Sequence, residues 1–216
     1  MNDCLIVFAK EPEIGRGKVR LSDELSQDQC LALYKAFLKD TLRLAETLEC
    51  NIKMLAYDIT AGAPGYLKRI DGNFILYRQE GNDLGQRMHN AFKFSSKVNS
   101  RQTVIIGSDS PNLPADYLKE AFWRLDTFDI VLGPCYDGGY YLVGLNTSCL
   151  EIFQDVKWSS ESVFENTVEN AVSLGKKIAI LPEWYDIDDL DGLERLKQDL
   201  KKDNNTAVWT RKFLKI

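Results

Sequence analysis

Short apolar runs recur along the chain, and polar stretches separate them. Most of these runs are rich in β-branched or aromatic residues, which is typical of strands buried in a sheet. The predicted strands span residues 4–9, 52–57, 74–77, 103–106, 130–132, 140–145 and 177–181.

A helical pattern fills several of the stretches between these runs. It is clearest over residues 26–50, where apolar side chains recur every three or four positions and so share one face of a helix. Ser26 and Gln29 have the spacing of a capping box, which predicts the start of this helix. Further helices are expected over residues 83–95, 114–125, 160–174 and 188–201.

The alternation of strand and helix in the middle of the chain predicts an α/β fold with a mostly parallel sheet. No repeat, low-complexity tract or flexible linker divides the sequence, so we expect one domain over residues 1–216, with a short tail after the polar stretch 201–205. In an open α/β sheet, ligands bind beyond the carboxyl ends of the strands. The loops that follow the predicted strands are therefore where binding residues are expected.

Composition narrows the class of protein. The chain has 216 residues, is 44% hydrophobic and carries a formal net charge of −5, so it offers no broad basic surface for nucleic acid. Five scattered cysteines and one histidine fit neither a zinc site nor a disulfide framework. No apolar stretch has the length of a membrane span. We expect a cytoplasmic protein whose partners are small molecules.

The loop after the first predicted strand combines cations with glycine. It contains Lys10, Gly15, Gly17, Lys18 and Arg20. Glycine lets backbone N–H groups approach phosphate oxygens, while lysine supplies a point charge and arginine a bidentate fork. The loop therefore predicts a phosphate site at the end of the first strand. A solvated basic surface turn is the alternative interpretation.

A single carboxylate, Asp109, follows the predicted strand 103–106. Mg²⁺ or Mn²⁺ commonly binds one or two protein carboxylates and completes its shell with substrate phosphate oxygens and water. Asp109 is therefore the first candidate for a metal ligand, and the cation would neutralise a departing phosphate. The alternative is that Asp109 only organises a turn by binding its own backbone.

Asp137, Gly138 and Gly139 lie between the predicted strands 130–132 and 140–145. Asp-Gly-Gly is a hairpin turn sequence. Its paired glycines also leave space for a ligand against the backbone, and Asp137 could accept hydrogen bonds from hydroxyl groups or act as a base. We place Asp137 among the catalytic candidates on the acceptor side, and Gly138 and Gly139 among the nucleotide-binding ones.

Two further polar segments are candidates. Gln79 could bind a base or ribose edge, and Asp83, which we also include in the nucleotide site, is foremost a helix cap. The late segment 186–189 carries three aspartates before a helix; one is expected to cap that helix, and Asp186 or Asp188 could complete the metal site if the segment lies beside Asp109. The segment Trp158-Ser159-Ser160 either caps the helix that follows it or lines the pocket.

Several spaced motifs occur in a fixed order along the chain. They are Phe8-Ala9-Lys10 with Pro12, Gly15, Lys18, Arg20 and Leu21, then Asp83-Leu84-Gly85, Gly107-Ser108-Asp109-Ser110-Pro111, and Gly133-Pro134 with Asp137-Gly138-Gly139-Tyr140-Tyr141-Leu142. Together they resemble the DUF2064 family, which looks like a branch of the GT-A nucleotide-diphospho-sugar transferases. The resemblance runs from about Cys4 to Leu190.

The resemblance implies a Rossmann-like GT-A sheet with a nucleotide at its carboxyl edge and a Mg²⁺ or Mn²⁺ ion. It implies that Lys18 and Arg20 belong to the phosphate-binding loop, Asp109 to the metal position and Asp188 to the late acidic position. Glycosyltransferases usually carry Asp-x-Asp at the metal, whereas Ser110 and Pro111 follow Asp109 here. That pattern is closer to the Asp-x-Pro of nucleotidylyltransferases.

Three functional hypotheses follow. The first is sugar transfer from a nucleotide-diphospho-sugar, in which Lys18, Arg20 and an Asp109-bound cation stabilise the leaving diphosphate. The second is nucleotidyl transfer from a nucleoside triphosphate to a phosphorylated small molecule. The third is a nucleotide-binding module without catalysis, which a solvent-facing Lys18 or Asp109 would favour.

Overall fold

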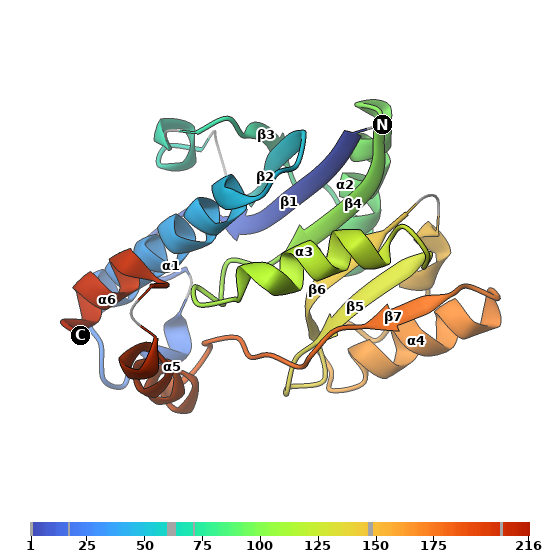
Figure 1. The fold of residues 1–216 in the computed structure, drawn as a ribbon. Coiled ribbons are helices and arrows are strands. Elements are labelled where there is room, and N and C mark those ends of the chain that lie inside the picture. The colour runs from blue at the N-terminus through green and yellow to red at the C-terminus, as the bar shows by residue number, and fades with distance from the viewer. Residues whose placement is uncertain (1, 17, 60–63, 71, 147–148, 204) are drawn as a thin grey trace.

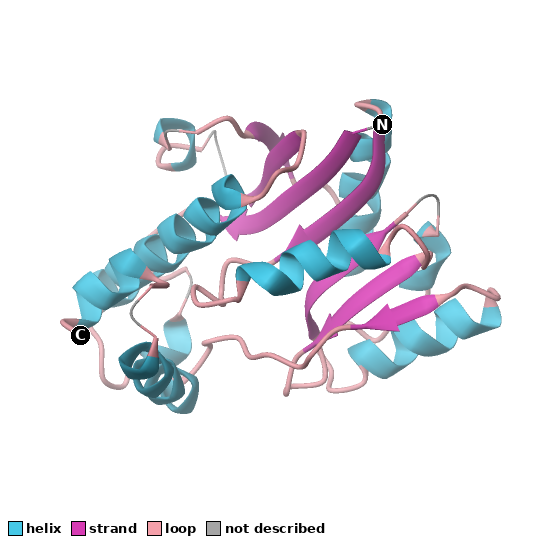
Figure 2. Ribbon diagram, in the orientation of Figure 1, coloured by secondary structure: helices cyan, strands magenta, loops and turns pink. Residues whose placement is uncertain are grey.

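Seven strands form one sheet in the order β3-β2-β1-β4-β6-β5-β7. The computed structural model describes residues 2–16, 18–59, 64–70, 72–146, 149–203 and 205–216. Within these ranges each of the seven predicted strands is present (Figures 1 and 2). The strands are β1 (Asn2–Lys10), β2 (Ile52–Asp58), β3 (Ile75–Arg78), β4 (Ser100–Ile106), β5 (Ile130–Pro134), β6 (Tyr140–Leu145) and β7 (Ile178–Ile180).

Most strand pairs are parallel, as the alternation of elements predicts. β1 pairs in parallel with β2 and β4, β2 with β3, and β5 with β7. β6 runs antiparallel to both of its neighbours. The reason is local, because a turn as short as 135–139 can join β5 to β6 only as a hairpin.

Two helices cover each face of the sheet. The helices are α1 (Gln27–Thr47), α2 (Leu84–Lys97), α3 (Ala115–Arg124), α4 (Val163–Ser173), α5 (Leu190–Lys202) and α6 (Val208–Leu214). α1 and α3 pack on one face and α2 and α4 on the other (Figure 1). The buried strand β1 explains both layers, because its side chains alternate between the two apolar cores. No helix in the described part of the chain is both long and apolar enough to cross a membrane.

The helix starts follow the sequence pattern. Ser26 and Gln29 form the predicted capping box of α1. Asp83 caps α2 by accepting a hydrogen bond from the Gln86 N–H, and Asp189 caps α5 by accepting one from the Gly192 N–H. These caps are local interactions, which is why residue spacing predicts them.

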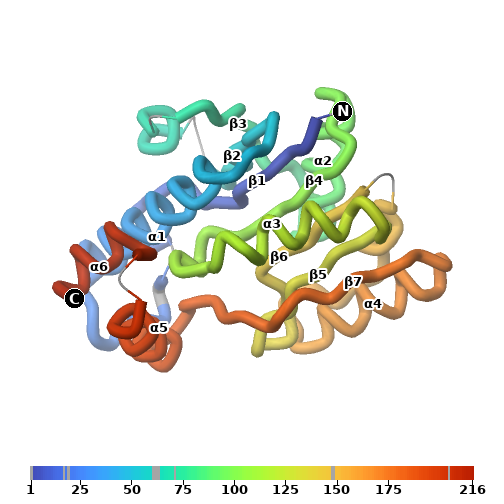
Figure 3. The backbone as a smooth tube through the Cα atoms, in the orientation of Figure 1, coloured from blue at the N-terminus to red at the C-terminus, as the bar shows by residue number. Residues whose placement is uncertain are grey.

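A third apolar cluster joins the two ends of the chain. Leu33 and Phe37 of α1 pack with Leu196 and Leu200 of α5, so the last third of the chain returns to the first helix. Figure 3 shows α5 and α6 beside the start of α1. This packing carries the segment before α5 to the end of β1, where the candidate site lies.

The short tail expected after residue 205 contains the helix α6, so that expectation was incomplete. Its first turn is bound by Asp40, a buried residue of α1. The Asp40 carboxylate accepts hydrogen bonds from the N–H groups of Trp209 and Thr210, at 3.0 and 2.8 Å, and from the Thr210 hydroxyl at 2.6 Å. A cap supplied from so far along the chain leaves no trace in the local sequence.

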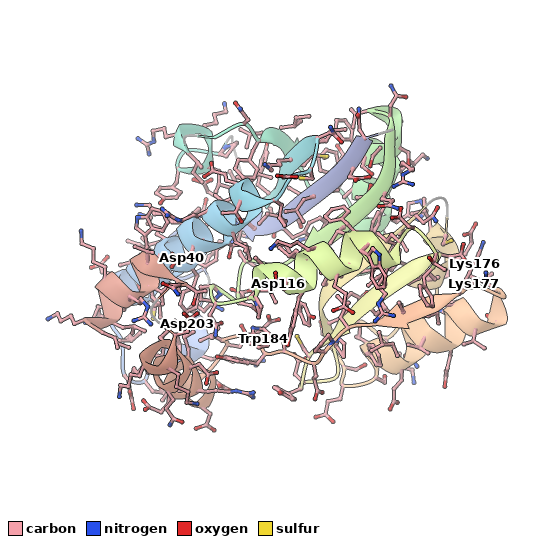
Figure 4. All side chains as sticks on the ribbon, in the orientation of Figure 1. Asp40, Asp116, Lys176, Lys177, Trp184 and Asp203 are labelled. Carbon is pink, nitrogen blue, oxygen red and sulfur yellow. The ribbon has the colours of Figure 1, made fainter. Side chains whose placement is uncertain are left out.

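We expect Asp40→Ala to lower the free energy of unfolding by about 1–3 kcal/mol, because the N–H groups at the start of α6 would lose their acceptor. Urea unfolding measures the change. Asp116→Ala is the control: Asp116 lies on α3 and forms an exposed ion pair with Lys119, so its loss should cost less than about 1 kcal/mol. Figure 4 shows both aspartates. Equal effects of the two substitutions would contradict the capping role.

Candidate nucleotide-binding site

A cleft of about 330 Å³ opens at the carboxyl ends of β1, β2 and β4. This is where an open α/β sheet binds its ligands, and the volume lies within the range of about 300–1,000 Å³ typical of small-molecule sites. Six of the candidate binding residues named from the sequence line it: Lys10, Lys18, Gln79, Asp109, Asp186 and Asp188.

The start of the first loop is fixed by two sets of hydrogen bonds. Where it leaves β1, the Tyr34 hydroxyl accepts a hydrogen bond from the Lys10 N–H at 2.7 Å and donates one to the Lys10 carbonyl at 2.9 Å. The buried Glu11 carboxylate accepts hydrogen bonds from the N–H groups of Tyr66 and Leu67. The loop is therefore held against its neighbours before it delivers Lys18 to the cleft.

Lys18 is a buried cation bound by carboxylates. Its side chain is 2% exposed, and its Nζ lies 2.6 Å from Asp109 Oδ1 and 3.3 Å from Asp188 Oδ1. It also donates a hydrogen bond to the Ile187 carbonyl at 2.5 Å. Burial alone would lower the pKa of Lys18, but the nearby Asp109 and Asp188 outweigh it and raise that pKa above its ordinary value. Lys18 is therefore charged.

The late acidic segment lies directly beside Asp109. The Ile187 N–H donates a hydrogen bond to the Asp109 carbonyl at 3.0 Å, which brings Asp186 and Asp188 to the end of β4. The three aspartates of this segment have different roles: Asp189 caps α5, whereas Asp186 and Asp188 line the cleft.

Asp186 is the most enclosed of these carboxylates. Burial and the charge of Asp109 raise its pKa to about 6, although a hydrogen bond from Ser110 at 2.5 Å opposes the shift. A carboxyl whose folded-state pKa lies above its ordinary value destabilises the fold when it ionises. The contribution of Asp186 to stability therefore falls as the pH rises towards and through about 6. The three carboxylates together make this end of the cleft strongly anionic, with Lys18 as their partner.

The other end of the cleft is formed by β2, the segment after β3 and α2. Gln79 donates a hydrogen bond to the Ala56 carbonyl at 2.8 Å. Asp58 binds two arginines, with Arg16 at 3.2 Å and Arg87 at 3.1 Å. Sequence reasoning missed Arg87, which lines the cleft from the end of the first turn of α2. Arg87 follows the Asp83 cap by four residues. This spacing puts it near the start of the predicted helix, beside the loops where binding residues were expected, and could have marked it as a candidate.

Several predicted site residues lie elsewhere among the described residues. Arg20 is exposed on the short helix Val19–Leu21, and Gly15 lies in an exposed turn; the cleft lining includes neither. Asp83 caps α2 and lines a separate groove. Gly17 falls outside the described residues.

The Asp137-Gly138-Gly139 segment forms the hairpin turn between β5 and β6. The exposed Asp137 carboxylate accepts a hydrogen bond from the Gly139 N–H at 3.0 Å, and none of the three residues lines the cleft. Gly138 has a φ of +82° and packs so tightly on Glu161 that a Cβ would lie 1.9 Å from the Glu161 carbonyl oxygen. The hairpin turn therefore explains both the positive φ of Gly138 and the hydrogen bond of Asp137.

The donor set suits a hard divalent cation. Asp109 and Asp188 both present carboxylate oxygens to the same point, at present bound by Lys18. In the part of the chain that is described, no three Asp, Glu, His or Cys side chains converge closely enough to hold a metal alone. A Mg²⁺ or Mn²⁺ ion with one or two protein carboxylates takes its remaining ligands from phosphate and water. The residues present fit that arrangement.

Residues 41–160 match the model of DUF2064, a family described as uncharacterized proteins conserved in bacteria. The chain belongs to the DUF2064 family. This confirms the resemblance seen in the spaced sequence motifs. No curated protein matches the sequence.

Solved structures agree with this DUF2064 fold. A provisionally named nucleotide-diphospho-sugar transferase from Desulfovibrio desulfuricans G20 is 28% identical, with a TM-score of 0.92 over 100% of this chain and 95% of that chain. The inositol-1-phosphate CTP transferase from T. maritima is 15% identical, with a TM-score of 0.60 over 98% and 96%. Rv0371c from Mycobacterium tuberculosis H37Rv, solved with manganese, is 14% identical, with a TM-score of 0.54 over 92% and 99%. The predicted α/β GT-A-like fold is confirmed.

We expect Lys18→Met to destabilise this DUF2064 protein by about 1–3 kcal/mol, because it removes the cation shared by the carboxylates, of which Asp109 and Asp188 are partly exposed and so screened by solvent. Lys10→Met is the matched control, since Lys10 lines the same cleft but is exposed. It should change the free energy of unfolding by less than about 0.5 kcal/mol. Urea unfolding at neutral pH compares the two variants, and equal stability of both would show that the Lys18 contacts do not hold the loop.

Proposed function

We propose that this protein is a transferase that binds a nucleotide-diphospho-sugar in the cleft and transfers the sugar to a small-molecule acceptor. The supporting observation is the convergence of a buried ammonium, Lys18, with Asp109 and Asp188 at the carboxyl end of the sheet. The fully overlapping D. desulfuricans structure, which carries a nucleotide-diphospho-sugar transferase name, agrees with this proposal.

The charge of Lys18 is suited to a diphosphate leaving group. In sugar transfer the bond between the anomeric carbon and the diphosphate oxygen breaks and the diphosphate keeps the electron pair, while an acceptor hydroxyl oxygen bonds to that carbon and gives up its proton to a base or to water. The Lys18 ammonium is held at the carboxyl end of the sheet by three contacts, and it can stabilise the developing charge once one of them is exchanged for a diphosphate oxygen. Lys10, exposed at the cleft wall, supplies a second positive charge to the same phosphates.

A divalent cation would share the carboxylates that Lys18 contacts in this structure. Asp109 and Asp188 would hold Mg²⁺ or Mn²⁺, and Asp186 lies next to them with its hydrogen bond from Ser110. When bound, the cation supplies further neutralisation of the diphosphate. Lys18 must then exchange a carboxylate contact for a phosphate contact, which its flexible side chain permits.

The other end of the cleft is suited to the nucleoside. Gln79 and the Asp58–Arg87 pair present hydrogen-bonding groups on β2, α2 and the segment after β3. A base and ribose offer matching donors and acceptors on their edges. Asp137 stays a proposed acceptor-side residue, on a hairpin whose Cys135 lies beside Asp186.

Nucleotidyl transfer is the second candidate, and one observation favours it. Where glycosyltransferases carry a second aspartate after Asp109, this chain has Ser110 and Pro111. The Ser110 hydroxyl binds Asp186 rather than facing an incoming metal. The third hypothesis, a module without catalysis, is weakened because Lys18 is buried against the two aspartates instead of facing solvent.

Ligand binding tests the site. We expect at least one of the UDP-, GDP-, ADP-, CDP- and TDP-sugars to raise the melting temperature by several degrees in the presence of Mg²⁺ or Mn²⁺. At about 100 times its dissociation constant a ligand adds about 2.7 kcal/mol. Asp109→Asn should abolish the metal-dependent part, whereas Asp116→Asn, outside the cleft, should keep it. A full shift in Asp109→Asn would refute the assigned site.

Product analysis separates the two reactions. Incubation of the protein with the donor selected above and a panel of sugar, polyol and phosphorylated acceptors should release a nucleoside diphosphate if a sugar is transferred. Release of pyrophosphate from CTP or GTP would assign nucleotidyl transfer instead. We expect Lys18→Met to reduce the rate at least about 100-fold, because removal of one preorganised charge-stabilising group typically costs that much. An unchanged rate would contradict its role.

A further inference from the structure

A second groove lies on the other side of the first turns of α2. Its volume is about 650 Å³, within the range of small-molecule sites. α2 contributes Gly85 and His89 to its lining, and the segment 150–158 contributes Asp155 and Trp158. Asp83, which the sequence placed in the nucleotide site, lines this groove together with Gly85 of the same motif.

Trp158 is built into the wall of the groove. Gly85 has no side chain, and the indole occupies the space beside it: a Cβ on Gly85 would lie 2.3 Å from Cζ2 of Trp158. Trp158 also packs against Phe153, with 6.3 Å between ring centroids. Glycine is needed here for close approach rather than for its backbone conformation. The indole is therefore held in place, although Trp158 is only half-buried.

Four polar side chains of the groove have unused hydrogen-bonding atoms. Within the described part of the chain, no hydrogen bond or ion pair involves the Trp158 indole N–H, the His89 imidazole, the Asp155 carboxylate or the Gln154 side-chain amide. Their polar neighbours are engaged: Asp83 accepts a hydrogen bond from the Gln86 N–H, and Asn90 donates one to the Glu80 carbonyl. The unused atoms thus gather at one place.

The chemistry of these atoms restricts the ligand. A phosphate would meet the negative charges of Asp83 and Asp155, and it offers no hydrogen to an ionised carboxylate. An ammonium would satisfy Asp155 but has no acceptor for the indole N–H. A hydroxyl group both donates and accepts, and the C–H face of a hydroxylated ring packs well against an aromatic side chain.

We propose that this groove binds an uncharged polyhydroxylated ring, a sugar or a cyclic polyol. Trp158 provides the packing surface and the indole donor, Asp155 accepts hydrogen bonds from hydroxyl groups, and His89 offers one donor and one acceptor. The groove shares the first turns of α2 with the nucleotide cleft, because Leu84 and Arg87 line the cleft while Gly85 and His89 line the groove.

Ligand-observed NMR tests the groove without any nucleotide or metal. Saturation transfer to glucose, mannose, N-acetylglucosamine and myo-inositol is measured on the wild-type protein, with inorganic phosphate and choline in separate displacement experiments. We expect at least one hydroxylated ring to bind, and His89→Ala and Trp158→Phe each to weaken it about fivefold to tenfold, the effect of one lost hydrogen bond. Trp123→Ala, an exposed tryptophan on α3, is the control and should bind normally.

Three results would overturn the proposal: no binding of any of the four rings at tens of millimolar, binding that is unchanged in both groove variants, or displacement of the ring by phosphate or choline. Melting temperatures establish that each variant is folded. The nucleotide-dependent shift in melting temperature is measured on His89→Ala as well. Failure of the groove leaves that shift intact, whereas failure of the nucleotide site leaves the saccharide signal intact.

Discussion

The contact of the buried Lys18 ammonium with Asp109 and Asp188 is the interaction on which the candidate site depends. It joins three segments that are far apart in the sequence: the loop after β1, the turn after β4 and the segment before α5. Charges buried in this way are stable only when they are paired and hydrogen-bonded. The opposite charges of Lys18 and the aspartates therefore hold the site together. A phosphate would compete for Lys18 and a divalent cation for the aspartates, so binding of these ligands would rearrange the contacts.

The scaffold explains why these three segments meet. β1 and β4 are adjacent parallel strands, so the loop after one and the turn after the other leave the sheet at the same edge. The third segment arrives there because α5 packs on the start of α1 through an apolar cluster, and the backbone hydrogen bond from Ile187 to Asp109 sets its register. Apolar packing between α1 and α5, away from the cleft, thus fixes the positions of Asp186 and Asp188.

α2 separates two binding surfaces at this edge. One side of its first turns faces the nucleotide cleft through Leu84 and Arg87, and the other side forms the groove under Trp158. The Asp83 cap and the glycine at position 85 make both possible, the first by starting the helix at the sheet edge and the second by admitting the indole. The two surfaces differ in chemistry, because the cleft brings a buried ammonium together with three aspartates while the groove presents an indole, an imidazole and a carboxylate.

The sequence alone determined the class of fold, the seven strands, the five longer helices and the caps at Ser26 and Asp83, because each depends on residues within a few positions of one another. It also indicated Lys18 and Asp109 as candidates, since both follow strands whose carboxyl ends share an edge. The tertiary structure alone decided that Asp186 and Asp188 lie beside Asp109, that Arg87 enters the cleft and that Arg20 does not line it. It likewise decided that Asp40 caps a helix at the end of the chain. The residues in these contacts are brought together by the packing of the third apolar cluster and by the order of strands in the sheet. No local spacing encodes either of them.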